Sequence, residues 1–425
     1  MNFEALFGGI GRALSHPIYR NYWAGQGTNS IGRWMYRTAI GWLTWELTES
    51  TSWLGIVAFA DSIPLVAITI FAGAVTDRIG YFRIMRVISL VATVLAAVFA
   101  ALVVFGHINV YWVVALTAAL GCCEAITYPA RVSAVNYLVP KKDLAPAIAL
   151  GSTTFNGARI IGPALAGVMI LWAGVGPVLA VSSATYLIFA LVLMFTPVVE
   201  PPRPTKKMDV LGDIMDGFRY VLREPGIFFL LTLVGLLGLF VRPYIELLPG
   251  YAAQVFSRGP DGLAILLSAI GIGAMCAGFW VAQRGRTSGL TRLVAFSVMA
   301  MAFSVIVFTL FDHIWIAAVW LVAAGFFMLC ANVCAQTLIQ NAVDPTMRAR
   351  VIGLFIVISW GLPAIGAMAM GWIASIVGIR PAVIGGSAIV VVWWWVSSRR
   401  VAGKVAPGLE HGDETRTIAV KRAAE

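Results

Sequence analysis

Ionisable side chains interrupt the long apolar segments of this 425-residue chain at widely separated positions. A charged group in hydrocarbon is expensive, so each one predicts a partner and a function. Carboxyl groups at such depth can take up and release protons, and the planar fork of an arginine can bind a carboxylate or a phosphate. The chemistry indicated is therefore the binding of protons and solutes within a membrane. The residues are Arg33, Arg37, Asp61, Glu124, Arg131, Arg159, Arg242 and Glu246.

The embedded charges do not balance. Five arginines accompany three acids, which leaves an excess of two positive charges if all of them are ionised. An anionic group on a solute, such as a carboxylate, phosphate or catecholate, would complete the balance. The alternative is that the charges are structural and neutralise one another, for instance Glu124 with Arg33, or Arg242 with Glu246 one turn further along.

A buried carboxyl group whose arginine partner moves between two conformations can carry a proton through a transport cycle. Glu124, near the middle of its segment, is the first candidate for this role and Asp61 is the second. A histidine relay is not expected, because the four histidines fall at segment edges or in the tail. No G-x-x-x-x-G-K-S/T sequence occurs, so we expect no nucleotide or other cofactor and an ion or solute gradient as the source of energy.

The composition predicts the elements that must position these groups. Hydrophobic residues make up 60% of the chain and charged residues 12%, which excludes a soluble domain and predicts an all-α polytopic membrane protein. A helix needs about 20 residues to cross the hydrocarbon. We predict twelve spans, near residues 19–45, 53–75, 84–105, 110–138, 144–171, 176–197, 226–249, 262–283, 290–311, 314–339, 350–376 and 380–399.

The distribution of charge predicts the orientation. Most Lys and Arg residues fall in loops and tails that would be cytoplasmic, and Arg258 and Arg380 are the ones predicted outside. Both termini are therefore expected in the cytoplasm. No removable signal peptide is visible, and residues 1–17 have the spacing of an interfacial helix that leads into the first span. Topology and anionic lipid account for the net charge of +10, so no nucleic acid partner is expected.

All five cysteines fall inside predicted spans, so disulfides are not expected. Cys330 and Cys334 lie one turn apart, where a soft metal or a redox role is conceivable. We favour the packing of small apolar side chains and expect no metal site.

The spans divide into two halves. We predict a segment 1–18, a six-helix bundle 19–197, a cytoplasmic linker 198–225 with an amphipathic helix at Val210 to Leu222, a second six-helix bundle 226–400 and a tail 401–425. A shift of 204 residues superimposes parts of the halves, such as Gly162 on Gly366 and Gly167 on Gly371. Parallel repeats with a site between them suit alternating access by rocking.

A short loop joins the second and third spans, with the sequence Gly73-Ala-Val-Thr-Asp77-Arg78-Ile-Gly80-Tyr-Phe-Arg83. Its glycines permit a tight turn, its aspartate can face a helix N-terminus, and its arginines suit a cytoplasmic surface. It resembles the G-x-x-x-D-R-x-G-R-R/K signature of major facilitator superfamily transporters, apart from Tyr81 and Phe82. The resemblance implies the two-bundle major facilitator fold and a conformational latch formed by Gly73, Asp77, Arg78, Gly80 and Arg83, which Arg131 is expected to close with Asp77.

The second half departs from this signature. Its corresponding loop, Gly278-Phe-Trp-Val-Ala-Gln-Arg284-Gly-Arg286, keeps the basic residues but lacks the aspartate, so any latch is asymmetric.

Further stretches resemble one branch of the superfamily, the enterobactin-exporter-like efflux permeases and drug:proton antiporters. These stretches are Tyr19-Arg-Asn-Tyr-Trp-Ala-Gly-Gln26, Ala39-Ile-Gly-Trp-Leu-Thr-Trp-Glu, Tyr128-Pro-Ala-Arg131 and Ala158-Arg-Ile-Ile-Gly-Pro-Ala-Leu-Ala-Gly167. In that architecture the first, fourth, seventh and tenth helices line the cavity. The resemblance implies a substrate site formed by Arg33, Arg37, Glu124, Arg242, Glu246, Asn332 and Gln336.

The fifth predicted span resembles the antiporter motif of the superfamily. Proline removes a backbone hydrogen bond and glycine permits close helix contact, so the element is either a helix pivot or a tightly packed interface. Its residues are Arg159, Gly162, Pro163 and Gly167.

These observations favour a proton-coupled exporter of a small amphipathic organic molecule, with or without an anionic group. An importer or facilitator of an organic anion is the alternative within transport, and a transport-inactive assembly factor or receptor is the alternative outside it. A membrane enzyme is not favoured, because no nucleophile and base or metal-ligand set stands out. We expect a monomer in the bacterial inner membrane, in contact with lipid, substrate and protons.

Overall fold

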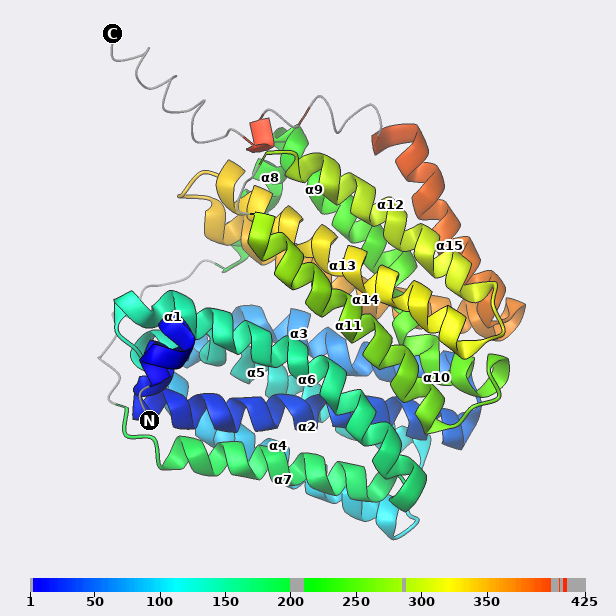
Figure 1. Ribbon diagram of the computed structural model, residues 1–425, viewed down its shortest axis with the longest axis horizontal. Helices are drawn as coiled ribbons and strands as arrows, with labels where there is room; N and C mark the ends of the chain where they lie inside the picture. The colour runs from blue at the N-terminus through cyan, green and yellow to red at the C-terminus, as the bar shows by residue number, and fades with distance from the viewer. Residues whose placement is uncertain (1–2, 199–209, 285–287, 399–404, 406–407, 411–425) are drawn as a thin grey trace. The chain divides into compact units, whose positions relative to one another are not determined.

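The structure is a computed structural model that describes residues 3–198, 210–284, 288–398, 405 and 408–410. Within the helices it leaves the side chains of residues 3–8, 70–71, 73–74, 77–78, 210–211, 213–214 and 397–398 undescribed. Every regular element in these ranges is helical, which confirms the predicted fold class (Figure 1).

The chain forms two compact units, which we describe separately. The first comprises residues 1–208 with 249–268, and the second comprises 209–248 with 269–425. The segment 249–268 belongs to the first unit because it packs there. The Ser268 hydroxyl donates to the Ile160 carbonyl at 3.2 Å, and a Cβ on Gly167 would lie 2.4 Å from the Ala264 Cβ.

The described residues of the first unit include seven helices in its N-terminal part. The principal neighbours are α2 with α6 and α7, α3 with α5, and α4 with α5 and α7 (Figure 1). The helices are α1 (Phe3–Ser15), α2 (Pro17–Thr48), α3 (Thr51–Ile79), α4 (Tyr81–Val104), α5 (Val110–Ala134), α6 (Leu144–Ala173) and α7 (Val175–Met194). The helix predicted within residues 1–17 is thus confirmed.

Glycine fixes both the turns and the close contacts of this unit. Gly80 has φ +102° between α3 and α4, and Gly174 has φ +78° between α6 and α7, a region of φ that side chains disfavour. Gly121 of α5 lies against α3, where an added Cβ would be 2.6 Å from the Asp61 carbonyl oxygen. This close contact holds α3 and α5 at a distance that lets the Thr69 hydroxyl of α3 reach the Ala125 carbonyl of α5.

The second unit begins with the amphipathic helix α8 (Val210–Arg223), close to the predicted range. Tyr220 donates to Asp344 at 3.2 Å, and Arg350 pairs with Asp216 at 3.3 Å, so α8 is docked onto its own unit. Its other long helices are α9 (Pro225–Leu236), α12 (Leu290–Thr309), α13 (Ile314–Ala342), α14 (Arg348–Val377) and α15 (Ile379–Trp393). Helix α11 (Pro260–Arg284) is divided, with residues 260–268 in the first unit and 269–284 in the second.

The seventh span differs from the regular helix predicted at 226–249. After α9 the chain forms a π-helix at Leu237–Val241, a 3₁₀ helix at Arg242–Leu247, the short α10 (Leu248–Gly250) and a second π-helix at Tyr251–Val255. Two prolines, Pro243 and Pro249, explain the irregularity, because neither can donate a backbone hydrogen bond. The span is therefore longer than predicted and its middle is not α-helical.

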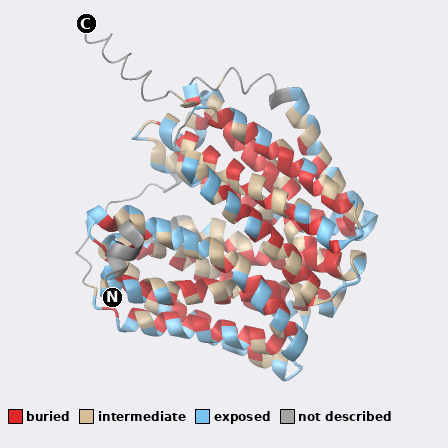
Figure 2. Cartoon of the chain, in the orientation of Figure 1, coloured by how far each residue is buried: buried red, intermediate tan, exposed pale blue. Residues whose placement is uncertain are grey.

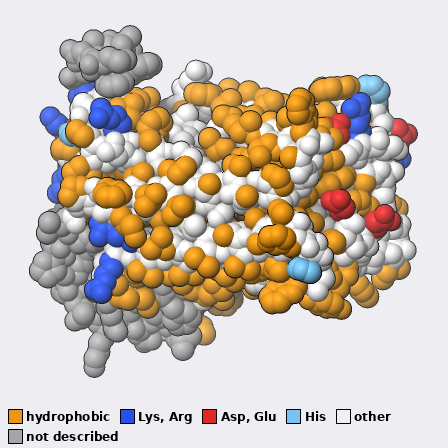
Figure 3. Space-filling model, turned by 90° about the horizontal axis from the view of Figure 1, so that it is seen from below, with side chains coloured by type: hydrophobic (Ala, Val, Ile, Leu, Met, Phe, Trp, Pro, Cys, Tyr) orange, Lys and Arg blue, Asp and Glu red, His pale blue; other side chains and the backbone are white. Residues whose placement is uncertain are grey.

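Eleven described helical segments are long and apolar enough to cross a membrane. The other predicted span lies in α2, which has 32 residues but carries Arg33, Arg37 and several amides. Burial in Figure 2 follows the inner faces of the helices, and Figure 3 shows apolar side chains over the visible face between ends where charged residues gather. The chain is thus a multi-pass membrane protein, as predicted.

Candidate functional site

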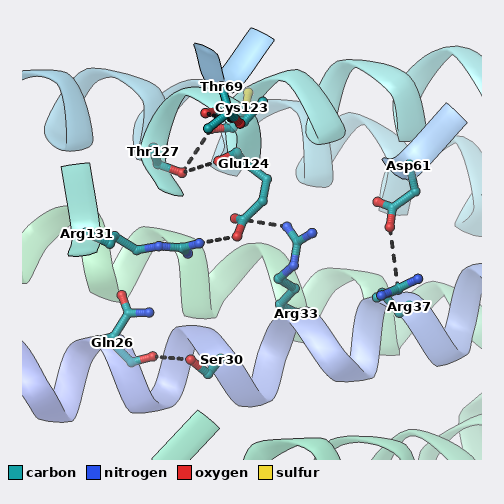
Figure 4. A network of polar contacts seen from close by, with 11 residues as sticks. Gln26, Ser30, Arg33, Arg37, Asp61, Thr69, Cys123, Glu124, Thr127 and Arg131 are labelled. Atoms are coloured by element: carbon teal, nitrogen blue, oxygen red, sulfur yellow. Dashed lines mark hydrogen bonds and ion pairs between the residues drawn. The ribbon is translucent and has the colours of Figure 1, made fainter. Parts of the chain in front are cut away.

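A single carboxylate in the first unit is held by two arginines. Arg33 Nη1 lies 3.0 Å from Glu124 Oε2, and Arg131 Nη2 donates to Glu124 Oε1. The three side chains are only 14–20% exposed. Figure 4 shows the two guanidinium groups approaching the carboxylate from different directions. Each oxygen of Glu124 thus has its own charged donor, which is the strong form of hydrogen bond.

Regular helix geometry creates this arrangement. Arg131 lies seven residues after Glu124 on α5, about two turns along the same face. Arg33 reaches the same carboxylate from α2. The alternative predicted pair of Glu124 with Arg33 is therefore present. Arg131 contacts Glu124 as well, and its predicted contact with Asp77 remains a prediction, because the Asp77 side chain lies outside the described residues.

A second ion pair lies further along α2. Arg37 Nε is 3.5 Å from Asp61 Oδ2 of α3. The indole ring of Trp34 lies 5.6 Å from the guanidinium carbons of both Arg37 and Arg159. One aromatic ring thus accompanies two of the embedded cations, an arrangement that stabilises positive charge where water is scarce.

The helix that carries Glu124 has a break in its backbone hydrogen bonding. Pro129 has no N–H, so it cannot donate to the carbonyl of Ala125 four residues earlier. The Thr69 hydroxyl of α3 donates to that carbonyl instead, at 3.3 Å. The turn beside Glu124 is therefore supported from a neighbouring helix.

The same arrangement occurs in the second unit and explains Arg242. Pro363 leaves the Ser359 carbonyl of α14 without its helical donor. Arg242 Nη1 donates to this carbonyl at 2.7 Å. The predicted neutralisation of Arg242 by Glu246 remains a prediction, although the helix that carries them is not the expected α-helix. In a 3₁₀ helix with three residues per turn, residues four apart are separated by about 120°.

The other predicted substrate residues lie on α13. Asn332 and Gln336 are half-buried there. Cys330 and Cys334 on the same helix are buried, and the described part of the chain contains no cluster of three His, Cys, Asp or Glu residues that could hold a metal ion. The proposed roles of Asn332 and Gln336 in substrate binding remain predictions.

The predicted latch loop is only partly described. The side chains of Gly73, Asp77 and Arg78 lie outside the described residues, whereas Gly80 and Arg83 lie within them. The loop is as short as predicted, because α3 ends at Ile79 and α4 begins at Tyr81. Its function as a latch remains a prediction.

The antiporter-like motif makes a close interface between two helices. A Cβ added to Gly162 of α6 would lie 2.5 Å from the Trp34 Cβ and 3.1 Å from the Ile31 carbonyl oxygen on α2. Pro163 is buried within α6, which is helical throughout. These contacts support the packing interpretation, and a pivoting role remains a prediction.

Sequence reasoning missed one polar cluster near the start of the chain. Asp143, before α6, accepts from Arg12 Nε at 3.2 Å and lies 3.0 Å from His16 Nε2. Its side chain is 2% exposed. The signal in the sequence was an acid directly before a predicted span, where it can face a helix N-terminus. Two basic residues near the start of the chain, Arg12 in α1 and His16 after it, were available as its partners.

Comparisons with known proteins give a consistent result. The profile of a family described as transmembrane secretion effector, within the major facilitator superfamily, matches residues 12–404. The staphyloferrin A transporter of Staphylococcus aureus is 23% identical, with 82% of this chain and 87% of that protein aligned. The multidrug efflux pump Tap of Mycolicibacterium fortuitum is 26% identical, with 83% of this chain and 88% of that protein aligned.

Two further matches bear on the branch and the fold. The enterobactin exporter EntS of Shigella boydii is 23% identical over 60% of this chain and 61% of that protein. A crystal structure of a bacterial homologue of the human lysosomal transporter Spinster, inward-facing and unoccupied, has a TM-score of 0.70 at 15% identity, covering 90% of this chain and 97% of that one. That likeness shows the fold. The resemblance stated from the sequence is confirmed.

Proposed function

Because this chain belongs to the transmembrane secretion effector family of major facilitator transporters, we propose that it is a proton-coupled exporter of small amphipathic organic molecules. It is a membrane transporter and not an enzyme. The names of two relatives, a multidrug efflux pump and an enterobactin exporter, support the outward direction. The proposal places both termini in the cytoplasm and the protein in the bacterial inner membrane, with alternating access as its mechanism.

The observation that carries the proposal is the pairing of Glu124 with both Arg33 and Arg131. While Glu124 is ionised it holds α2 and α5 together by two charge-assisted contacts. Protonation removes the negative charge and weakens both contacts at once. One proton can therefore bias the packing of two helices, as a coupling site requires.

The cluster also bears on the charge of the solute. Arg33, Arg131 and Glu124 together carry one net positive charge, and the Arg37 and Asp61 pair adds none when all are ionised. An anionic solute that bound these arginines would displace Glu124 and so favour its protonation, which loads proton and anion together. A neutral or cationic solute has no such attraction, and the added charge of a proton would oppose a cation. Antiport thus fits an uncharged or cationic amphiphile better than an anion.

This charge argument sustains the second candidate, an importer of an organic anion that moves together with a proton. The two functions differ in the sign of coupling between proton and solute. Both use Arg33, Arg37, Glu124 and the proposed second-half residues Arg242, Glu246, Asn332 and Gln336.

Transport in proteoliposomes tests the proposal. We expect an outward-directed solute flux driven by a proton gradient, and proton movement in the opposite direction when substrate is added. Glu124→Gln imitates the protonated carboxyl, so gradient-driven accumulation should be lost while solute exchange without a gradient survives. Wild-type accumulation by this variant would exclude Glu124 as the carrier and make Asp61→Asn the next test.

Dyes of matched size and different charge distinguish the two candidates. The exporter hypothesis predicts that neutral and cationic dyes exchange against protons. The importer hypothesis predicts that an anionic dye moves with protons and that Arg33→Gln weakens its binding while sparing a neutral analogue. Equal losses for both dyes would indicate that Arg33 is needed for folding alone.

A further inference from the structure

A small polar cavity adjoins Glu124 within the first unit. Its volume is about 20 Å³, enough for one water molecule. It is enclosed by α2, α4, α5 and α7, and its polar lining includes Asn29, Arg33, Ser89, Glu124, Thr127 and Arg131. It therefore contacts the proposed carrier and both of its arginines.

Two amide side chains of α2 have buried oxygen atoms without a hydrogen-bond partner. Asn29 is 5% exposed and lines the cavity, and its Oδ1 is unsatisfied. The Oε1 atom of Gln26, one turn earlier, is unsatisfied as well. A buried carbonyl oxygen without a donor destabilises a protein by about 1–3 kcal/mol, so such groups are normally paired.

The unsatisfied amides share the face of α2 that carries Arg33. At about 100° per residue, Gln26, Asn29 and Arg33 fall within about 60° of one another. Gln26 is about 10 Å nearer than Arg33 to the start of the helix, at 1.5 Å per residue. Figure 4 shows Gln26 beside Arg131, on the side away from Arg37. The polar face thus leads from the cluster towards the predicted cytoplasmic end of α2.

We propose that Asn29 and Gln26 hold water that carries the proton between Glu124 and the cytoplasm. This inference rests on the proposed function, because it assumes that Glu124 is the carrier. An unsatisfied acceptor oxygen selects a hydrogen-bond donor, which water provides and a halide ion does not.

The transfer conserves every atom. The carboxyl proton of Glu124 passes to the water oxygen, and that water passes one of its own protons to the next water towards the cytoplasm. Glu124 is left as a carboxylate, which reforms its contacts with Arg33 and Arg131. The relay therefore discharges the carrier and restores the helix contacts in the same step.

Replacing the proposed relay with apolar groups tests the inference. Asn29→Leu keeps the number and branching of side-chain heavy atoms but has no acceptor, so substrate-induced proton flux in proteoliposomes should fall by about tenfold or more, as expected for loss of a positioned proton-transfer group. Solute exchange without a pH gradient should fall much less. Asn29→Ser, which can still bind water, should recover part of the proton flux. Gln26→Leu should reproduce the loss if Asn29→Leu fails to insert.

Thr28→Val is the matched control on the same helix, because the Thr28 hydroxyl donates to the Ala24 carbonyl of its own helix at 2.9 Å. It should leave proton flux unchanged. Hydrogen-deuterium exchange of the Glu124 carboxyl, read as the infrared band that Glu124→Gln removes, should slow in Asn29→Leu.

The outcomes separate this inference from the proposed function. If Glu124→Gln abolishes accumulation while Asn29→Leu and Gln26→Leu keep wild-type proton flux and carboxyl exchange, the relay is wrong and the exporter proposal stands. If proteoliposomes with the Glu124→Gln variant accumulate solute at the wild-type level, then both the role of Glu124 as proton carrier and the proposed water relay are wrong.

Discussion

The two units satisfy a proline-freed carbonyl in the same way but with donors of different charge. In the first unit, Pro129 frees the Ala125 carbonyl and the neutral hydroxyl of Thr69 donates to it. In the second, Pro363 frees the Ser359 carbonyl and the guanidinium of Arg242 donates to it. A backbone carbonyl does not titrate, so the Arg242 contact cannot respond to a proton.

This difference assigns unlike roles to arginines that look alike in sequence. Arg33 and Arg131 face a carboxylate, whose charge can change during a cycle. Arg242 contacts a carbonyl oxygen of fixed partial charge and so supports the packing of the seventh span on α14. The Glu124 cluster of the first unit is therefore expected to respond to a proton. If Glu124 stays ionised throughout the cycle, its contacts with Arg33 and Arg131 are as fixed as that of Arg242, and the two units do not differ in this respect.

The largest effect should come from leaving Glu124 without either arginine. The double variant Arg33→Gln with Arg131→Gln should lower the free energy of unfolding by about 3 kcal/mol, because an unpaired carboxylate stays buried. Adding Glu124→Gln should recover much of the loss. Thermal or denaturant unfolding of the purified protein measures both changes. No recovery in the triple variant would show that the arginines stabilise the fold independently of Glu124.

Arg242→Leu should have the next largest effect, a loss of about 2 kcal/mol, because the Ser359 carbonyl loses a charged donor. Pro363→Ala restores a backbone N–H four residues after Ser359, so it should reduce the cost of Arg242→Leu. A double-mutant cycle of unfolding free energies isolates this coupling. Additive effects would mean that Arg242 stabilises the protein through other contacts.

Thr69→Val should have a smaller effect, about 0.6 kcal/mol, which is typical of neutral side-chain hydrogen bonds in membranes. Pro129→Ala supplies the missing backbone donor and should suppress this loss. Thr93→Val is the control on a neighbouring helix, since its hydroxyl donates to Ser89 within α4 at 2.8 Å. A larger loss for Thr69→Val than for Arg242→Leu would reverse the proposed difference between the units.

The sequence predicted the features that depend on local pattern. The lengths of the apolar segments predicted the membrane spans, and the glycines of the short loop predicted the break between helices at Gly80. The pair of Glu124 with Arg33 was also foreseen as an alternative, because few acids were available at membrane depth. These predictions need only residue type and approximate depth.

Features that depend on packing between distant segments could not be predicted in the same way. The spacing of four residues before Pro363 identifies Ser359 as a freed carbonyl, but nothing local names a donor 117 positions away. The 3₁₀ turn at Arg242 changed which residues share a face. The contact of Asp143 with Arg12 and His16 likewise joins segments more than 120 residues apart.

The loops before α4 in the first unit and α12 in the second differ in how the start of the helix is stabilised. Gly80 before α4 and Gly289 before α12 both have positive φ, and neither helix start has a side-chain cap from its own N-cap residue. In the second unit, Glu410 near the end of the chain supplies a carboxylate. It accepts from the Gly289 N–H at 2.6 Å and from the Thr291 N–H at 3.0 Å.

Glu410→Gln should therefore lower stability by about 0.5 kcal/mol, because it removes a negative charge from a helix N-terminus but leaves an acceptor in place. Hydrogen exchange of the amides at 289–293 should accelerate more than exchange elsewhere in α12. Leu409→Ala should act similarly, since Leu409 is 2% exposed and lies against Gly226. Glu46→Gln, an exposed acid on α2, should change neither quantity. Unchanged exchange at 289–293 in both tail variants would mean that the second loop, which lacks the aspartate of the first, is stable without a carboxylate from the tail.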